Sequence, residues 1–83
     1  MIDTIRELLK KYAGLQVDVD SLDVGADLYA AGLSSFASVQ LMLAIEERFD
    51  VEFPDSMLNR KSFQSIDAIT RTVSTITEDR KVA

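Results

Sequence analysis

The fold is decided by the stretch Asp27-Leu28-Tyr29-Ala30-Ala31-Gly32-Leu33-Ser34-Ser35-Phe36-Ala37-Ser38-Val39-Gln40-Leu41, in which a glycine turn leads through two serines into a long helix. Gly32 permits a backbone conformation with positive φ, so it suits the turn. A serine at the start of a helix places its hydroxyl beside the free N–H groups of the first turn. These N–H groups and the helix dipole make the start of the helix electropositive, so it suits a phosphate. The purely structural alternative is that Ser34 or Ser35 serves only as the N-cap of the helix.

The composition restricts the chemistry that this chain can perform. At 83 residues the chain is expected to form one domain over residues 1–83, with a frayed tail from residue 78. It contains no cysteine and no histidine, which excludes disulfides, thiolate or imidazole metal sites, and nucleophiles activated by histidine. An enzyme built from this chain would have only carboxylates, lysines, tyrosines and hydroxyls, and we expect neither a metal site nor enzymatic activity.

The net charge of −5 is concentrated in the middle of the chain. Nine acidic residues and one basic residue, Arg48, lie between residues 18 and 55, whereas both flanking segments are net positive. Such a field repels nucleic acid and attracts basic partner proteins, unless the acids form a merely solvated face. Because Asp3 and Arg6 lie near the start and no run of 18 apolar residues follows, we expect no signal peptide, no membrane span and a cytoplasmic location.

The first helix is predicted over residues 2–13, where apolar residues recur at helical spacing, and Gly14 is expected to end it. From residue 14 to residue 34 no helical period of useful length appears. A connection of this length in a compact domain is either functional or pinned to the core. Residues 27–31 are expected to make a single helical turn that Gly32 ends.

The second helix is predicted over residues 35–49 and is apolar on two sides. One side is the expected core stripe, which consists of Leu41, Ile45 and Phe49 with Met42 and Ser38 beside it. The other side carries Phe36, Val39 and Leu43, flanked by Gln40 and Glu47. We call these last five residues the docking face, because four short helices cannot easily surround one of their number and an exposed apolar stripe marks a partner surface.

The rest of the chain completes an all-α fold. Residues 51–53 are too short for a confident strand, and Pro54 is placed to open a short helix over residues 55–60, with Met57 and Leu58 pointing inward. A last helix is expected to begin between Ser62 and Ser65. The prediction is a small four-helix bundle of three long helices and one short helix, with a long loop between the first two.

This arrangement resembles the acyl and peptidyl carrier protein family over residues 5–76. Gly32-Leu33-Ser34-Ser35-Phe36 lies over the Gly-X-Asp-Ser-Leu signature of acyl carrier proteins, and Phe53-Pro54-Asp55 resembles the segment that opens their third helix. The resemblance implies that a phosphopantetheinyl transferase attaches 4′-phosphopantetheine to Ser35 through a phosphodiester. The arm would hold an aminoacyl or acyl group as a thioester and present it to partner ligases or transferases.

The chain departs from typical fatty-acid carriers at several positions of this segment. Ser34 replaces the usual aspartate, Phe36 replaces leucine, and Ala37 and Gln40 stand where acidic residues are common. The run from residue 28 to residue 36 instead resembles small stand-alone carriers that accept an activated amino acid from a ligase related to aminoacyl-tRNA synthetases. We therefore expect a monomeric aminoacyl carrier, and the alternatives are a fatty-acid or polyketide acyl carrier and an unmodified helical adaptor.

Overall fold

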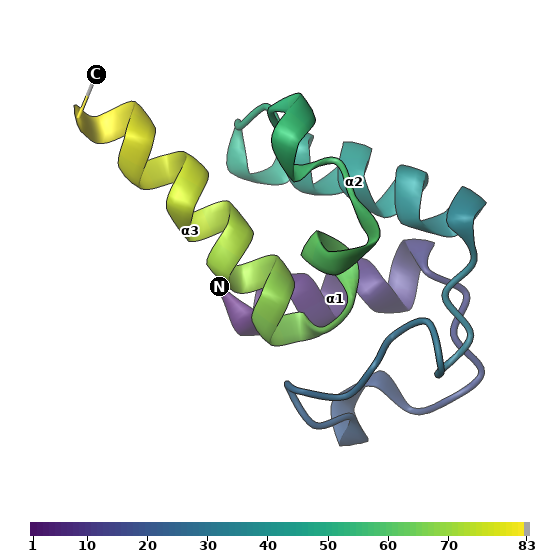
Figure 1. Ribbon diagram of the computed structural model, residues 1–83. Coiled ribbons are helices and arrows are strands. Elements are labelled where there is room, and N and C mark those ends of the chain that lie inside the picture. The colour runs from purple at the N-terminus through teal and green to yellow at the C-terminus, as the bar shows by residue number, and fades with distance from the viewer. Residues whose placement is uncertain (83) are drawn as a thin grey trace.

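Over residues 1–82 the chain folds into three α-helices and three short 3-10 turns (Figure 1). The computed structural model describes the backbone of residues 1–82 and the side chains of residues 1–78. In chain order the elements are α1 (Ile2–Tyr12), η1 (Val19–Ser21), α2 (Ser35–Phe49), η2 (Asp55–Met57), η3 (Arg60–Phe63) and α3 (Ile66–Val82). The described backbone contains no strand, so the expected all-helical class is confirmed.

The helix α1 lies against both α2 and α3, and η3 lies against α3 (Figure 1). The side chains that are completely buried come from all three helices and from the connection between α1 and α2, which we call the first connection. They are Ile5, Leu9, Leu28, Leu41, Ile45, Ile66, Ile69 and Val73. Two aromatic rings extend this core beyond the helices, since Phe53 stacks on Phe63 with ring centroids 5.3 Å apart. Phe49, which the sequence places in the core stripe, is only partly buried and packs against the edge of the core.

The ends of the helices follow local chemistry. Gly14 has φ of 62° just after α1, which is the left-handed conformation expected of the residue that ends this helix. Asp50 adopts the same conformation after α2, with φ of 53°. The side chain of Ser65 accepts a hydrogen bond of 3.0 Å from the Ala68 N–H, so α3 begins at the end of the predicted interval. The helix continues to Val82, through most of the segment expected to fray, and Ala83 lies outside the described residues.

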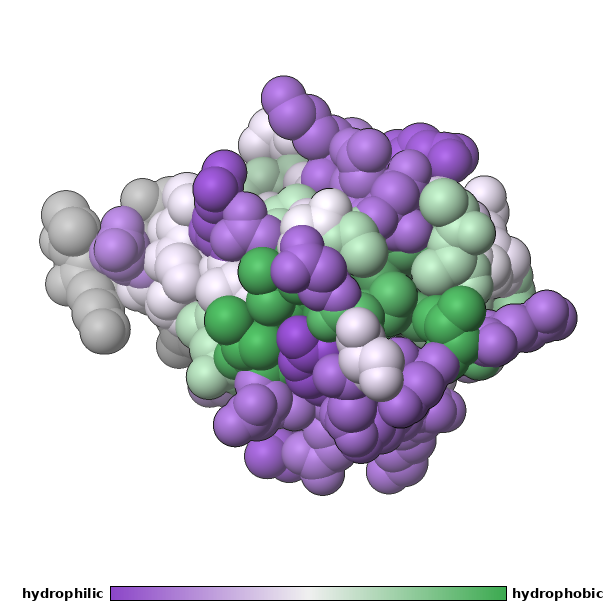
Figure 2. All heavy atoms as spheres, turned by 90° about the horizontal axis from the view of Figure 1, so that it is seen from below, coloured by the Kyte–Doolittle hydropathy of each residue, from purple (hydrophilic) through white to green (hydrophobic). Residues whose placement is uncertain are grey.

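The connection between α1 and α2 is fixed to the start of α3 by backbone hydrogen bonds. The Leu28 N–H donates to the Gln64 carbonyl at 2.7 Å, and the Asp67 N–H donates to the Val24 carbonyl at 2.9 Å. The Arg6 guanidinium donates to the Val19 carbonyl at 2.6 Å, which fixes η1 to α1. Figure 2 views the side of the molecule on which this connection lies and shows apolar surface in the middle of that face, with polar residues around it. The connection is thus a packed part of the domain.

The segment before α3 differs from the predicted short helix over residues 55–60. It forms two 3-10 turns, η2 and η3, separated by Leu58 and Asn59. Asn59 has an extended backbone and its side chain accepts a hydrogen bond from the Ser62 N–H, so a local side-chain contact replaces helix continuation. The inward orientation predicted for Leu58 is wrong because this side chain is 43% exposed, whereas Met57 packs against the core.

Candidate functional site

The turn before α2 has the form that the sequence predicts. The Ala31 N–H donates to the Asp27 carbonyl at 3.1 Å, which closes a single helical turn, and Gly32 follows with φ of 114°. The Asp27 side chain accepts a hydrogen bond from the Tyr29 N–H at 2.9 Å and stabilises this turn. With Leu28 completely buried, the turn fixes where α2 begins.

Ser34 is the N-cap of α2. Its backbone is extended, with φ of −86° and ψ of 164°, and its hydroxyl oxygen accepts a hydrogen bond of 3.0 Å from the Ala37 N–H. This contact satisfies one of the N–H groups that a helix leaves unpaired in its first turn. The capping role considered for either serine therefore belongs to Ser34.

Ser35 is the first residue of α2, and its side chain is exposed. Its carbonyl accepts a hydrogen bond of 2.7 Å from the Ser38 hydroxyl, but its own hydroxyl has no hydrogen-bond partner among the described residues. The hydroxyls of two other serines in this half of the chain are engaged: Ser38 donates to the Ser35 carbonyl, and Ser21 donates to the Asp18 carboxylate at 2.9 Å. Ser35 thus combines exposure with a free hydroxyl at the positive end of a helix that carries no acidic residue in its first turn.

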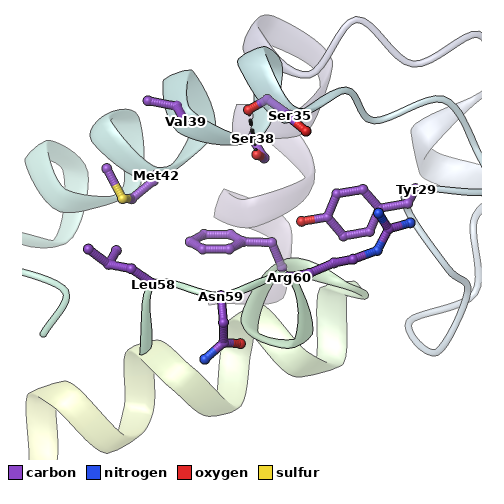
Figure 3. Close-up of a pocket in the computed structure, with 9 residues that line it drawn as sticks. Tyr29, Ser35, Ser38, Val39, Met42, Leu58, Asn59 and Arg60 are labelled. Carbon is purple, nitrogen blue, oxygen red and sulfur yellow. Dashed lines mark hydrogen bonds between the residues drawn. The ribbon is translucent and has the colours of Figure 1, made fainter. Parts of the chain in front are cut away.

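A groove of about 490 Å³ begins at Ser35. Figure 3 shows it between α2 and the segment that contains η3. Its lining combines apolar and polar side chains from three parts of the chain: Ser35, Ser38, Val39 and Met42 of α2, Tyr29 of the first connection, and Leu58, Asn59, Arg60 and Phe63. Since Phe63 is buried and stacked on Phe53, the groove is built on the core of the domain.

Arg60 and Tyr29 form a pair at this groove. The guanidinium carbon of Arg60 lies 4.0 Å from the centroid of the Tyr29 ring, within the range of a cation–π contact. The sequence pattern did not predict a site role for these two residues or the groove positions of Leu58 and Asn59. The residues lie in turns, where hydrophobic periodicity gives no signal.

The docking face is exposed, as the sequence predicts. Phe36, Val39 and Leu43 have exposed fractions of 74%, 52% and 55%, and Gln40 and Glu47 are exposed beside them. Large apolar side chains so exposed on one helix are typical of a partner surface, and the docking role itself stays a prediction. Ala37 is not part of this face because it is partly buried against the core.

The described residues show neither a metal-binding cluster nor a membrane-spanning helix. They contain no group of three or more acidic, histidine or cysteine side chains that could hold a metal ion. None of their helices has the length and hydropathy needed to cross a membrane.

The chain is similar to known carrier proteins over almost its whole length. A family model described as "Phosphopantetheine attachment site" matches residues 3–73. The chain is 62% identical to the aminoacyl carrier protein of Agrobacterium fabrum over 80 residues, which are 96% of both chains.

Solved structures give the same result. The fold matches a chain in the crystal structure of an engineered Bradyrhizobium japonicum glycine:[carrier protein] ligase complexed with carrier protein from Agrobacterium tumefaciens and ATP. The TM-score is 0.88, and the two chains are 65% identical over 90% of this chain and 97% of that one. It also matches a chain in the structure of the Bradyrhizobium japonicum ligase complexed with glycylated carrier protein, with TM-score 0.66 and 31% identity over 86% and 90% of the two chains. The protein therefore belongs to the phosphopantetheine attachment site family, whose members carry a covalently attached 4′-phosphopantetheine.

Proposed function

We propose that this protein is an aminoacyl carrier that holds a small amino acid on a 4′-phosphopantetheine arm attached to Ser35. The observation that carries the assignment of the residue is the exposed Ser35 hydroxyl, which has no partner among the described residues and lies at the first position of α2. Ser34 occupies the capping position and so leaves its neighbour available.

The residues around Ser35 fit such an arm. The group would bring a thiol, which this cysteine-free chain lacks, and would hold the amino acid as a thioester. The absence of acidic residues from the first turn of α2 leaves the positive end of the helix available to the phosphate. Ser34 keeps the helix start ordered, and the turn fixed by Leu28 positions it against the core.

Three similarities support an amino acid as cargo. The relative from Agrobacterium fabrum is named an aminoacyl carrier protein, and the matching crystal structures contain a glycine:[carrier protein] ligase, in one case with a glycylated carrier. Glycine is accordingly the first amino acid to test. Fatty-acid carriage is the second candidate, and it is disfavoured by Ala37 and Gln40, which stand where acids are common in those carriers.

The docking face is the surface that we assign to partner enzymes. Phe36 and Val39 lie within the first five residues of α2, close in sequence to the attachment site, and Leu43 continues the apolar stripe one turn further. Gln40 and Glu47 would contribute polar contacts at its edges. The partners are a phosphopantetheinyl transferase and an ATP-dependent amino acid ligase.

In this role the protein performs no chemistry of its own. Confining the cargo near a docked enzyme raises its local concentration without a tight complex. A single domain over residues 1–83, acting as a monomer in the cytoplasm where coenzyme A and ATP are supplied, fits this function. We also assign η2 and η3 together to the place of the short helix of a carrier four-helix bundle, after the long first loop.

The attachment site can be tested on the apo protein. Incubation with coenzyme A and a broad-specificity phosphopantetheinyl transferase should add one arm, as read by intact mass, and Ser35→Ala should abolish the addition. Ser34→Ala is the matched control and should still be modified. Modification that survives in Ser35→Ala and disappears in Ser34→Ala would refute the assignment.

The cargo can be tested on the holo protein. Incubation with ATP, glycine and a glycine:[carrier protein] ligase should give a thioester that hydroxylamine cleaves. Efficient malonyl loading and chain elongation by fatty-acid enzymes, without an aminoacyl thioester from any candidate ligase, would instead assign the protein to acyl carriage. A protein that is never modified in its native cytoplasm would be an unmodified adaptor.

A further inference from the structure

The groove beside Ser35 has a polar end and an apolar end. Ser35, Tyr29 and Arg60 contribute to its polar part, whereas Met42 and Leu58 supply apolar surface. In Figure 3 the Tyr29 hydroxyl points into the groove and the Arg60 guanidinium lies beside the Tyr29 ring, on the same side as Ser35. Any group attached to Ser35 therefore starts at the polar end, with the apolar end within the same groove.

Arg60 has hydrogen-bonding capacity that the described protein does not use. Its guanidinium rests on the Tyr29 ring but makes no ion pair or hydrogen bond with any described side chain. A guanidinium carries five N–H donors in a planar fork that matches phosphate oxygens, and an aromatic platform holds that fork in place. Arg60 is also the one charged residue among those that line the groove.

The arm that we assign to Ser35 has complementary chemistry. It begins with a phosphodiester, which is an anion, and continues as a chain with geminal methyl groups and amides. The negative charge of the phosphodiester is complementary to the Arg60 guanidinium, and the geminal methyl groups are complementary to the apolar side chains of Met42 and Leu58. Asn59 has little to offer the arm, because its side chain already accepts from the Ser62 N–H and donates to the Ser56 carbonyl at 3.0 Å each.

We propose that Arg60, held on the Tyr29 ring, is a positioning residue that binds the phosphodiester on Ser35 and lays the arm in the groove against Met42 and Leu58. This inference rests on the proposed attachment at Ser35. Val39 lines the groove and also belongs to the docking face, so a seated arm and a docked enzyme meet at this residue. The groove thus holds the arm when no partner enzyme is bound.

The test compares apo and holo protein by NMR. In the wild-type chain, attachment of the arm should shift the methyl signals of Met42 and Leu58, and the arm's geminal methyl protons should show nuclear Overhauser contacts with them. Arg60→Gln should lose these shifts and contacts and should move the ³¹P signal of the phosphodiester. The matched control is Lys61→Gln, which removes the same charge from the next residue, outside the groove lining, and should keep them.

The outcomes separate this inference from the carrier function. Intact mass is recorded on every sample, and a wild-type chain that gains no arm on Ser35 would contradict the carrier function itself. A chain that gains the arm but shows no shifts at Met42 and Leu58, or in which Arg60→Gln and Lys61→Gln behave alike, would overturn the role of Arg60. Since Arg60 is exposed, its variant should unfold at the temperature of the wild-type apo protein, which confirms that any loss is local.

Discussion

At the scale of single residues, the start of α2 divides two tasks between neighbouring serines. Ser34 has an extended backbone and its hydroxyl caps the helix, whereas Ser35 is already helical and its hydroxyl is exposed without a described partner. The sequence alone left the cap open between the two, because both are good capping residues. The backbone dihedral angles decide the assignment, and they depend on Gly32 and the packed turn before it.

The exposed and buried sides of α2 give the first prediction. Leu43→Ala should change the free energy of unfolding by under about 0.5 kcal/mol, because Leu43 is exposed on the docking face. Ile45→Ala should cost about 2–5 kcal/mol, because Ile45 is completely buried. Urea unfolding measures both, and ligase loading should weaken for Leu43→Ala. Equal losses of stability would show that the docking face is packed in solution.

At the scale of elements, the sequence predicted the helices better than the turns. α2 occupies the predicted residues 35–49, and α1 ends one residue before the predicted end. A helix is predicted well because its hydrophobic period repeats over many residues and a glycine marks its end. The segment after Pro54 could not be predicted in this way, since the capping side chain of Asn59 divides it into two turns. The groove was equally out of reach, because Tyr29, Met42 and Arg60 come together only through tertiary packing.

The first connection gives the second prediction. Leu28→Ala should lower the free energy of unfolding by about 2–5 kcal/mol although it lies outside every regular helix, because its side chain is completely buried. Val17→Ala, in the same connection but 44% exposed, is the control and should change stability little. Thermal or urea unfolding of both variants measures this. A mild effect at Leu28 would show that the connection is only loosely attached.

The polar edge of the docking face gives the third prediction. Gln40→Glu adds one negative charge at an exposed position without disturbing the core, unlike a charge at the partly buried Ala37. Charge complementarity mainly sets encounter rates and excludes wrong partners, so the variant should be used better by fatty-acid enzymes and worse by the amino acid ligase. Initial rates with both enzymes measure the change. Unchanged rates with both enzymes would mean that partner enzymes do not respond to the charge at position 40.

At the scale of the whole molecule, the acidic residues of the middle of the chain lie in three places. These are the first connection (Asp18, Asp20, Asp23 and Asp27), the last turns of α2 (Glu46 and Glu47) and the segment after α2 (Asp50, Glu52 and Asp55). Asp20 pairs with Lys10 at 2.5 Å, while Asp18, Asp23 and Asp27 accept hydrogen bonds from nearby groups of the connection instead. These turn contacts leave the charges of these three carboxylates without a basic partner among the described side chains. The connection that leads to Ser35 therefore carries part of the negative charge predicted for the middle of the chain.

This charge gives the fourth prediction, which concerns the oligomeric state. The net charge of −5 should oppose self-association through the exposed apolar side chains of α2, so light scattering should give the mass of one chain. Adding salt to screen the repulsion is the control, and the mass should still be that of one chain, because the apolar stripe consists of three side chains only. A stable dimer that Leu43→Asp dissociates would contradict this prediction.

The hydrogen bonds that fix the first connection to α3 join main-chain atoms on both sides, Leu28 to Gln64 and Val24 to Asp67. Main-chain groups are the same for nearly every residue type, so these two links impose little selection on the side chains at their own ends. Exposed positions of the connection are then able to diverge between relatives while the start of α2 keeps its place. A lineage of such carriers could acquire new partner enzymes by changing surface residues of the connection, without first having to evolve a new fold.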